Sequence, residues 1–171
     1  MNRLLLLAAV LVLPFNVAYT EDAKQSAPTA ATYAIGGLHC PPCTRTVEAS
    51  LTRTKGIKSA KVDWATKSAR IQFDENVIAA TQVADAVART PHMMGSGLRY
   101  SGTLALSVPA IQDKDTGKAA ADALKKLPEV VKVNVFPSTH TLTIQFKDGV
   151  KLTSSQLIDA LDQAGMKAKT Y

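Results

Sequence analysis

The chain has 171 residues, of which 46% are hydrophobic and 20% charged, and its formal net charge is +6 at pH 7. This length suits one mid-sized domain or two small ones. The excess of lysine and arginine is mild and spread along the sequence, without an arginine-rich run or interleaved aromatic residues, so no nucleic-acid partner is expected.

Residues 1–20 have the pattern of a secretory signal peptide. A basic start at Arg3 is followed by an apolar run over residues 4–15 and by small residues around Ala18, which is the order found in such signals. The run is too short to span a bilayer stably, so we expect a periplasmic or secreted protein with no membrane anchor after cleavage. An uncleaved tethering helix is the alternative. Residues 21–31 are expected to form a flexible leader.

Residues 32–101 are expected to form a first unit that starts with a strand over 33–36 and a helix over 44–54. Lys55-Gly56 ends that helix, because glycine tolerates the left-handed conformation of a helix terminus. The inward stripe of the helix, at the i, i+4 spacing of one buried face, is Cys43, Val47 and Leu51.

Two more strands and a second helix follow in this unit. Apolar and polar residues alternate over 60–64 and 70–73, which predicts paired strands with one solvent-facing side. A second helix is expected to be capped by Thr81 and to stop before Pro91. Residues 98–100 would supply the closing strand.

The second half repeats this pattern. Arg70-Ile71-Gln72-Phe73 returns as Thr143-Ile144-Gln145-Phe146, a displacement of 73 residues. The elements expected in residues 102–171 are strands over 103–108, 131–135, 142–146 and 167–170 and helices over 116–127 and 154–163, with Val131, Val133 and Val135 facing Leu142, Ile144 and Phe146.

This order predicts an α+β protein built of tandem ferredoxin-like βαββαβ sandwiches. Units of about 70 residues bury small cores, so docking of the two against each other would help their stability. Only a few residues around Ser101-Gly102 separate them. A rigid or semi-rigid tandem is therefore expected.

The segment Gly37-Leu38-His39-Cys40-Pro41-Pro42-Cys43 holds the only two cysteines. They lie at the first strand-to-helix turn, where unpaired N–H groups and the positive end of the helix dipole favour thiolate. Pro42 at the first helical position costs no helix hydrogen bond. Two close thiolates suit Cu(I) or Hg(II) in near-linear geometry, whereas Zn(II) normally takes four ligands.

The segment, followed by a helix and the βαββαβ pattern, resembles the heavy-metal-associated domain family, whose motif is G-M-x-C-x-x-C. With the signal peptide in front, the chain is similar to periplasmic mercuric-ion-binding proteins and exported copper chaperones of that family. The resemblance implies that Cys40 and Cys43 are metal ligands. Cu(I) is expected first, because His92, Met93 and Met94 suit it, with Hg(II) or Zn(II) as alternatives. It also implies transfer by ligand exchange with a metal-donor or metal-acceptor protein, such as a membrane metal transporter.

Two departures from the family pattern stand out. Leu38 replaces the usual Met, a change of little volume or polarity. The second unit has no cysteine, because the 73-residue displacement places Asp113 on Cys40 and Thr116 on Cys43. Asp113 and Thr116 can form a solvated turn and helix cap, but they cannot hold a soft metal. We therefore interpret residues 102–171 as a degenerate copy that serves in packing or partner docking, with an unspecified ligand function as the alternative.

The segment Pro91-His92-Met93-Met94-Gly95 is expected at the same end of the sandwich as the cysteines. A thioether or imidazole from His92, Met93 or Met94 would suit three-coordinate Cu(I), so these are candidate accessory ligands. The alternative places a methionine in the core and His92 in solvent. His39 is either a further accessory ligand or a surface residue. His140, in the hairpin 137–141, is expected to be solvated.

Two other functions compete with metal carriage. Cys-Pro-Pro-Cys at a helix start could exchange disulfides, with Cys40 as the attacking sulfur. The fold expected here is not a thioredoxin fold, and no aromatic residue precedes Cys40 as it usually does in such enzymes. A purely structural disulfide would close a very short loop and stabilise little. No hydrolytic triad, phosphate-binding glycine loop or catalytic carboxylate pair is present, so the chain is not expected to be an enzyme.

Overall fold

The computed structural model describes residues 27–171, and the predicted signal peptide lies outside the described residues. In the described part, no helix is long and apolar enough to cross a membrane. The elements in chain order are β1 (Thr29–Gly36), α1 (Pro42–Thr52), β2 (Ile57–Asp63), β3 (Ser68–Phe73), α2 (Ala80–Ala88), β4 (Ser101–Ser107), α3 (Lys114–Lys125), β5 (Val130–Phe136), a 3₁₀ turn (Pro137–Thr139), β6 (Thr141–Phe146), α4 (Ser154–Gln163) and β7 (Lys169–Thr170).

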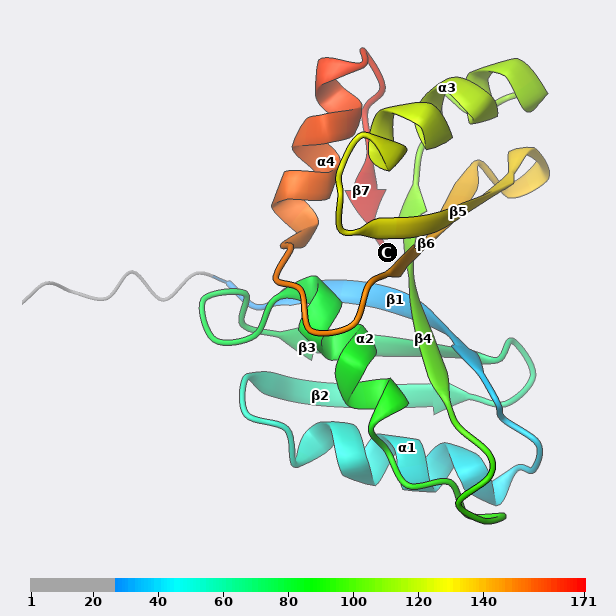
Figure 1. Ribbon diagram of the computed structural model, residues 1–171, viewed down its shortest axis with the longest axis vertical. Coiled ribbons are helices and arrows are strands. Elements are labelled where there is room, and N and C mark those ends of the chain that lie inside the picture. The colour runs from blue at the N-terminus through cyan, green and yellow to red at the C-terminus, as the bar shows by residue number, and fades with distance from the viewer. Residues whose placement is uncertain (1–26) are drawn as a thin grey trace, which may run out of the picture.

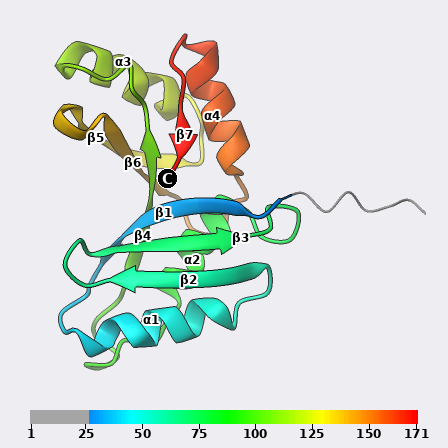
Figure 2. The ribbon, with the colours of Figure 1, turned by 180° about the vertical axis from the view of Figure 1, so that it is seen from behind.

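The strands form one antiparallel sheet in the order β2-β3-β1-β4-β6-β5, and β7 pairs with the far end of β4. Figures 1 and 2 show α1 and α2 with the strands of the first half, while α3 and α4 lie together at the other end of the molecule. The element order and the sheet are those of the predicted α+β, ferredoxin-like fold.

The two halves are joined by a shared strand, where the sequence predicted a linker. Ser101–Ala105 of β4 pairs with β1, and Leu104–Ser107 pairs with β6. The linker expected at Ser101-Gly102 is therefore inside a strand, and the separate closing strand expected at 98–100 does not form. A strand has two edges, so β4 is at once the last strand of the first half and the first strand of the second half within one continuous sheet.

The first strand is longer than predicted. Thr29–Ala31 pairs with β3, and Ala31 is fully buried, so these residues belong to β1 and not to a flexible leader. Ala31, Tyr33 and Ile35 face the core at the strand's two-residue period. Residues 29–31 are Thr-Ala-Ala, and side chains this small do not show the apolar-polar alternation by which a strand is predicted from sequence.

A β-bulge accounts for an error in the predicted core of the second half. The pairing of β5 with β6 shifts between Val130 and Lys132, so Val130 lies opposite Phe146, and Val131 is 55% exposed instead of buried. The first half has a bulge at the equivalent place, between Ile57 and Ser59. An extra residue in one strand changes the face on which its side chains lie.

Thr81 has a different role from the predicted helix cap. The N-cap of α2 is Ala79, whose N–H donates to Gln82 Oε1 (3.0 Å). Thr81 is buried, and its hydroxyl donates to the Val150 carbonyl (2.7 Å) and accepts from the Leu152 N–H (3.1 Å). The Thr81 hydroxyl therefore links the β6–α4 loop to the first half by two hydrogen bonds.

Glu75 makes a second link between the halves at the N-terminus of α4. Its Oε1 accepts from the backbone N–H and the hydroxyl of Ser154, at 2.7 and 2.8 Å. An anion at this end of a helix is stabilised by the unpaired N–H groups and the helix dipole. The carboxylate from the first half thus helps to hold a helix of the second.

We expect Glu75→Ala to lower the free energy of unfolding by about 1–3 kcal/mol, because it leaves a helix terminus without its charged acceptor. Glu75→Gln keeps an acceptor oxygen and should cost less. Urea unfolding measures both variants, with Asp159→Asn, an exposed carboxylate on α4, as the control. Equal stability of Glu75→Ala and wild type would show that the contact does not hold the halves together.

Candidate metal site

The two cysteines lie where β1 gives way to α1. Pro42 is the first residue of the helix, as predicted, and the Cys43 N–H donates to the Cys40 carbonyl at 3.0 Å. This turn brings the two Cα atoms to 5.4 Å, and the two sulfurs are joined in a disulfide. The loop lies at the end of the first half that points away from α3 and α4 (Figure 1).

The disulfide differs from the free thiolate pair that the sequence suggested. Cys43 is fully buried beneath the loop, and Cys40 is partly exposed. The Cα separation is within the ordinary range for a disulfide, so the same turn that gathers two thiolates also permits their oxidation. The structure is the oxidised form, and the two sulfurs can bind a metal only after reduction.

Glycine is required at the start of the loop. Gly37 has φ +82°, and a Cβ at this position would overlap the carbonyl of Arg99. Both the left-handed backbone and the close approach favour a residue without a side chain. The loop that carries Cys40 is therefore packed against the segment that enters β4.

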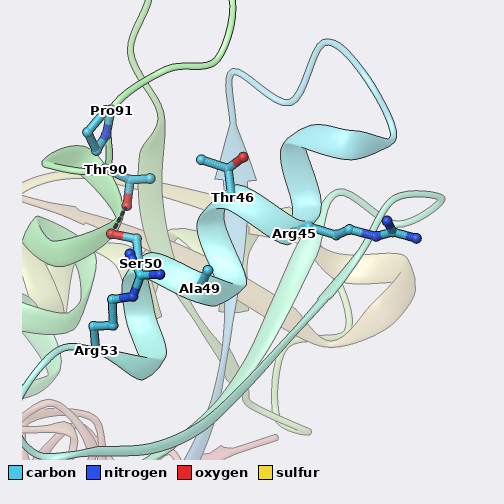
Figure 3. A pocket seen from close by; sticks show the side chains of 7 residues that line it. All are labelled: Arg45, Thr46, Ala49, Ser50, Arg53, Thr90 and Pro91. Carbon is cyan, nitrogen blue, oxygen red and sulfur yellow. Dashed lines mark hydrogen bonds between the residues drawn. The ribbon is translucent and has the colours of Figure 1, made fainter.

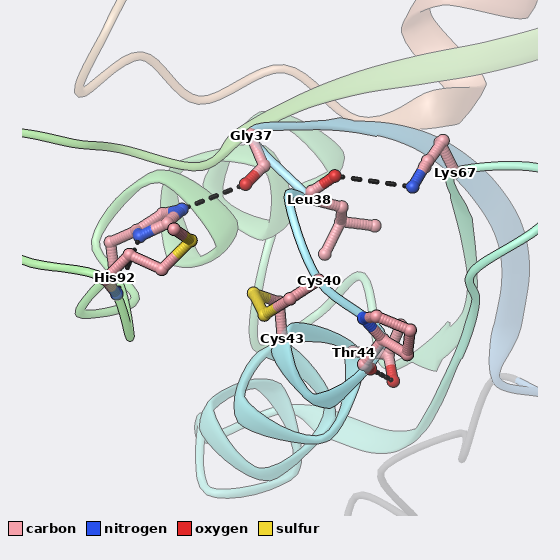
Figure 4. The surroundings of a disulfide bond; sticks show 9 residues. Gly37, Leu38, Cys40, Cys43, Thr44, Lys67 and His92 are labelled. Carbon is pink, nitrogen blue, oxygen red and sulfur yellow. Dashed lines mark hydrogen bonds between the residues drawn. A yellow bond between two sulfur atoms is a disulfide. The ribbon is translucent and has the colours of Figure 1, made fainter.

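Two side chains from other elements hold consecutive carbonyls of this loop (Figure 4). His92, in the α2–β4 loop, contacts the Gly37 carbonyl through Nε2 at 2.9 Å, and Lys67, in the β2–β3 turn, donates to the Leu38 carbonyl at 3.3 Å. Desolvation lowers the pKa of Lys67, whose ammonium also lies over the Trp64 ring. The path of the loop into Cys40 is thus fixed from two sides.

Both ring nitrogens of His92 are occupied. Because a carbonyl only accepts, Nε2 carries the proton, and Nδ1 accepts from the Met94 N–H at 3.1 Å. The ring stacks on buried Tyr100 at 4.4 Å and lies 5.5 Å from the His39 ring, centroid to centroid. His92 is therefore beside the cysteine loop, as the sequence predicted, although a hydrogen bond would have to break before it could bind a metal.

The methionines do not occupy the core, which was the alternative to a role as accessory ligands. Met93 is 54% and Met94 60% exposed, so neither fills the core. His39 is exposed next to Cys40. Ligation by His39, His92, Met93 or Met94 stays a prediction. In residues 27–171 no group of three or more His, Cys, Asp or Glu side chains gathers, so the cysteine pair is the candidate site.

The equivalent turn in the second half is closed by hydrogen bonds. The Thr116 N–H donates to Asp113 Oδ1 at 2.8 Å, which caps α3 as predicted. The Thr116 N–H and hydroxyl lower the pKa of the Asp113 carboxyl, because both donate to its charged form. His140 is exposed, and its Nδ1 contacts the Ile111 carbonyl at 2.6 Å.

Lys67 and Tyr100 are site residues that the sequence reading missed. Lys67 is in a polar hairpin turn with a positive φ of 51°, a position where a lysine is normally solvated. Tyr100 was assigned to a strand, and its contact with His92 depends on the packing of a long loop. No local pattern signals either contact, since Lys67 and Leu38 are 29 residues apart in the sequence and the stacking of Tyr100 on His92 depends on how the loop between them folds.

Comparison with known proteins finds one family model that matches within the first half and relatives whose similarity extends over more of the chain. The heavy-metal-associated domain model matches residues 32–92. The copper chaperone CopZ of Staphylococcus haemolyticus (strain JCSC1435) is 32% identical over 53 residues, which are 31% of this chain and 78% of that protein. The copper-transporting ATPase HMA5 of Oryza sativa subsp. japonica is 29% identical over 116 residues, which are 66% of this chain but only 12% of the ATPase.

Among solved structures, the water-soluble region of the P-type ATPase CopA from Bacillus subtilis is similar with a TM-score of 0.40 and 18% sequence identity. The match covers 84% of this chain and 91% of that one.

Proposed function

The chain belongs to the heavy-metal-associated domain family, and from that premise we propose that it binds one soft metal ion through Cys40 and Cys43 and passes it to another protein by ligand exchange. The observation that carries this proposal is the placement of both sulfurs in one turn at the start of α1. Helix N–H groups and the helix dipole favour thiolates there.

Copper(I) is the ion that we propose first. Two thiolates without a cluster of harder ligands suit Cu(I) and Hg(II), whereas Zn(II) normally takes four ligands. The similarity to a copper chaperone and to a copper-transporting ATPase supports copper. Mercury is second and zinc third.

Binding requires reduction of the disulfide. Two electrons and two protons, delivered by a dithiol reductant that becomes a disulfide, convert the Cys40–Cys43 bond into two thiols. Cu(I) then displaces both thiol protons and forms a dithiolate complex. Delivery to a second cysteine pair would proceed by stepwise exchange of one sulfur for another.

We propose that the partners are metal-donor or metal-acceptor proteins, including a membrane metal transporter. The similarity to copper-transporting ATPases supports that class. An exported location is proposed from the pattern of residues 1–20 alone. Residues 102–171 are proposed to be a degenerate copy, supported by the repeated element order, the equivalent bulge and the Asp113–Thr116 turn.

Native mass spectrometry of the chain after removal of residues 1–20 tests metal binding. Reduced protein is exposed to equimolar Cu(I), Hg(II), Zn(II) and Cd(II), and we expect one Cu(I) or Hg(II) ion to be retained per chain. The oxidised protein is the control and should retain none. Retention of no ion, or of Zn(II) in preference to the others, would contradict the proposal.

Disulfide exchange is the second candidate function, because the structure holds the Cys40–Cys43 disulfide with Cys40 partly exposed. An insulin-reduction assay without metal distinguishes the two functions. A metal carrier should show no turnover, while a thiol-disulfide exchanger should turn over repeatedly with a dithiol reductant.

A further inference from the structure

The two outermost strands of the sheet, β2 and β5, occupy equivalent places in the two halves. Each pairs on one side only, β2 with β3 and β5 with β6. The 73-residue displacement holds for these pairings, since Val62 lies opposite Ala69 and Val135 lies opposite Leu142. An outermost strand leaves the backbone N–H and C=O groups of every second residue unpaired, so it can serve as a template for another strand.

The edge of the first half, β2, is protected. Glu48 of α1 accepts from the Val62 N–H at 2.7 Å, and the same carboxylate lies 3.7 Å from the Lys61 ammonium. The bond shows that the Val62 N–H points away from the sheet, where a further strand would have to bind. Lys58, Lys61 and Asp63 of β2 are exposed. Charged side chains, lysines above all, keep edge strands from pairing with other chains.

The edge of the second half, β5, has none of these devices. The displacement replaces the four charged residues by uncharged ones, with Ala121 at the place of Glu48, Val131 at that of Lys58, Asn134 at that of Lys61 and Phe136 at that of Asp63. Val131 and Phe136 are 55% and 47% exposed.

The backbone at this edge is unpaired as well. The shared register turns the N–H groups of Val133 and Val135 outward, as it does that of Val62. Within residues 27–171 no side chain is hydrogen-bonded to either N–H group. The side chain of Val135 is held on the helix side of the sheet, where α3 approaches it so closely at Gly117 that a Cβ there would lie 2.6 Å from Val135 Cγ1. The outer edge of β5 is therefore open.

The open edge is complementary to a second copy of itself in the antiparallel direction. With Val133 at the midpoint, the two copies of Val133 face each other, Val131 faces Val135, and Lys132 faces Asn134. Apolar pairs then alternate with pairs in which no two like charges are opposite, which is the arrangement that stabilises neighbouring strands. Lys132 is the only charged residue of β5.

Other pairings of this edge are less favourable. A shift of the register by two residues would bring Pro137, which has no N–H to donate, opposite Val131. Head-to-tail pairing of β5 with β2 of another copy would have to displace Glu48 from the Val62 N–H. Two equal edges that pair with each other close a dimer, whereas head-to-tail pairing would continue from copy to copy.

We infer that β5 pairs with β5 of a second copy, so that the chain forms a symmetric dimer through its second half. The inference goes beyond the proposed function and does not depend on metal. The cysteine loop lies at the end of the first half that points away from α3 and α4 (Figure 1), so both copies of the loop stay free. The dimer gives the cysteine-free half a role of its own.

Sedimentation of the metal-free, oxidised chain after removal of residues 1–20 tests the inference, because the Cys40–Cys43 disulfide excludes association through a shared ion. We expect a monomer–dimer equilibrium with a dissociation constant of about 10–100 μM, since pairing of one strand buries less than a standard interface. A chain that stays monomeric up to about 1 mM, well above that constant, or that forms species larger than a dimer, would overturn the inference.

Amide hydrogen exchange identifies the strand that pairs. The N–H groups of Val133 and Val135 should exchange more slowly as the concentration rises. Those of Lys132 and Asn134 face β6 and should be protected in monomer and dimer alike. The amide of Ala60, the equivalent of Val133 on β2, is the internal control and should not change. A dimer without slower exchange at Val133 would have its interface elsewhere and would contradict the inference.

A charge exchange tests the register. Asn134→Lys puts two lysines opposite each other at both ends of the pairing and should raise the dissociation constant by about tenfold, because like charges directly opposite destabilise a sheet. Adding Lys132→Glu places opposite charges face to face and should restore the constant to within about threefold of wild type. Lys132→Glu alone should stay within about threefold as well, since it faces an uncharged residue.

The matched control for Asn134→Lys is Ala49→Lys, which adds the same charge to the first half. Ala49 is exposed and lines a groove of about 490 Å³ between α1 and Thr90–Pro91 (Figure 3), where a longer side chain has room. This variant should change the dissociation constant by less than about twofold. Thermal unfolding at low concentration shows that each variant is folded. Equal weakening by Ala49→Lys, or no rescue by Lys132→Glu, would refute the proposed pairing.

Discussion

Replacing Cys40 with serine is expected to weaken Cu(I) binding by the reduced protein by more than about a hundredfold. Loss of a residue that only supports a metal ligand typically costs about 10- to 100-fold in affinity, and loss of a direct ligand should cost more. The reason is that a serine hydroxyl is a hard, weakly acidic donor that does not replace a thiolate for a soft ion. Competition with a chromophoric Cu(I) chelator under reducing conditions measures the change. Cys43→Ser should lose binding to the same extent.

The two substitutions should differ in their effect on folding. Cys43 is fully buried, whereas Cys40 is partly exposed. Serine at 43 buries a hydroxyl, which costs about 1–3 kcal/mol when it has no partner, so only Cys43→Ser should lower the unfolding temperature of the reduced protein markedly. His39→Ala is the matched control for the loop. Wild-type Cu(I) affinity in Cys40→Ser would refute the proposed ligand pair.

Leu104→Ala is expected to destabilise both halves together by about 2–5 kcal/mol, because it removes a fully buried side chain and leaves a cavity. Leu104 lies opposite Tyr33 of β1 on one side of β4 and opposite Ile144 of β6 on the other. Denaturant unfolding is followed by the fluorescence of Trp64, the only tryptophan, in the first half, and by hydrogen exchange of β6 amides in the second.

The two probes should report one coincident transition in wild type and in Leu104→Ala. Val131→Ala is the control, since Val131 is 55% exposed and its truncation should change stability by less than about 0.5 kcal/mol. Separate transitions, with β6 unfolding at lower denaturant than the surroundings of Trp64, would mean that the halves fold as independent units.

The sequence predicted best those features that depend on local periodicity. The bounds of α4 were predicted at 154–163 as observed, and the stripe Cys43, Val47 and Leu51 is buried. The position of the cysteines at the start of a helix could also be predicted, because it follows from the strand and helix patterns around them.

The features that were missed depend on pairing between distant segments. A displacement of 73 residues shows two similar units, but it does not show that one strand serves both. Thr81 looked like a cap because threonine often caps helices, whereas its partners Val150 and Leu152 lie in the other half. The contacts of Lys67 and His92 with the cysteine loop are likewise long-range.

The common strand β4 has a consequence for how the metal would travel. Modules joined by a loose tether can swing toward a target while the remainder of the protein stays in place. Here no tether separates the cysteine-bearing part from its neighbour, since every residue from Ser101 to Ser107 is paired within the sheet. On the proposed function, delivery of the metal would require the whole molecule to diffuse and reorient. Inserting residues at the junction would divide the sheet and would not extend the reach of the cysteine loop.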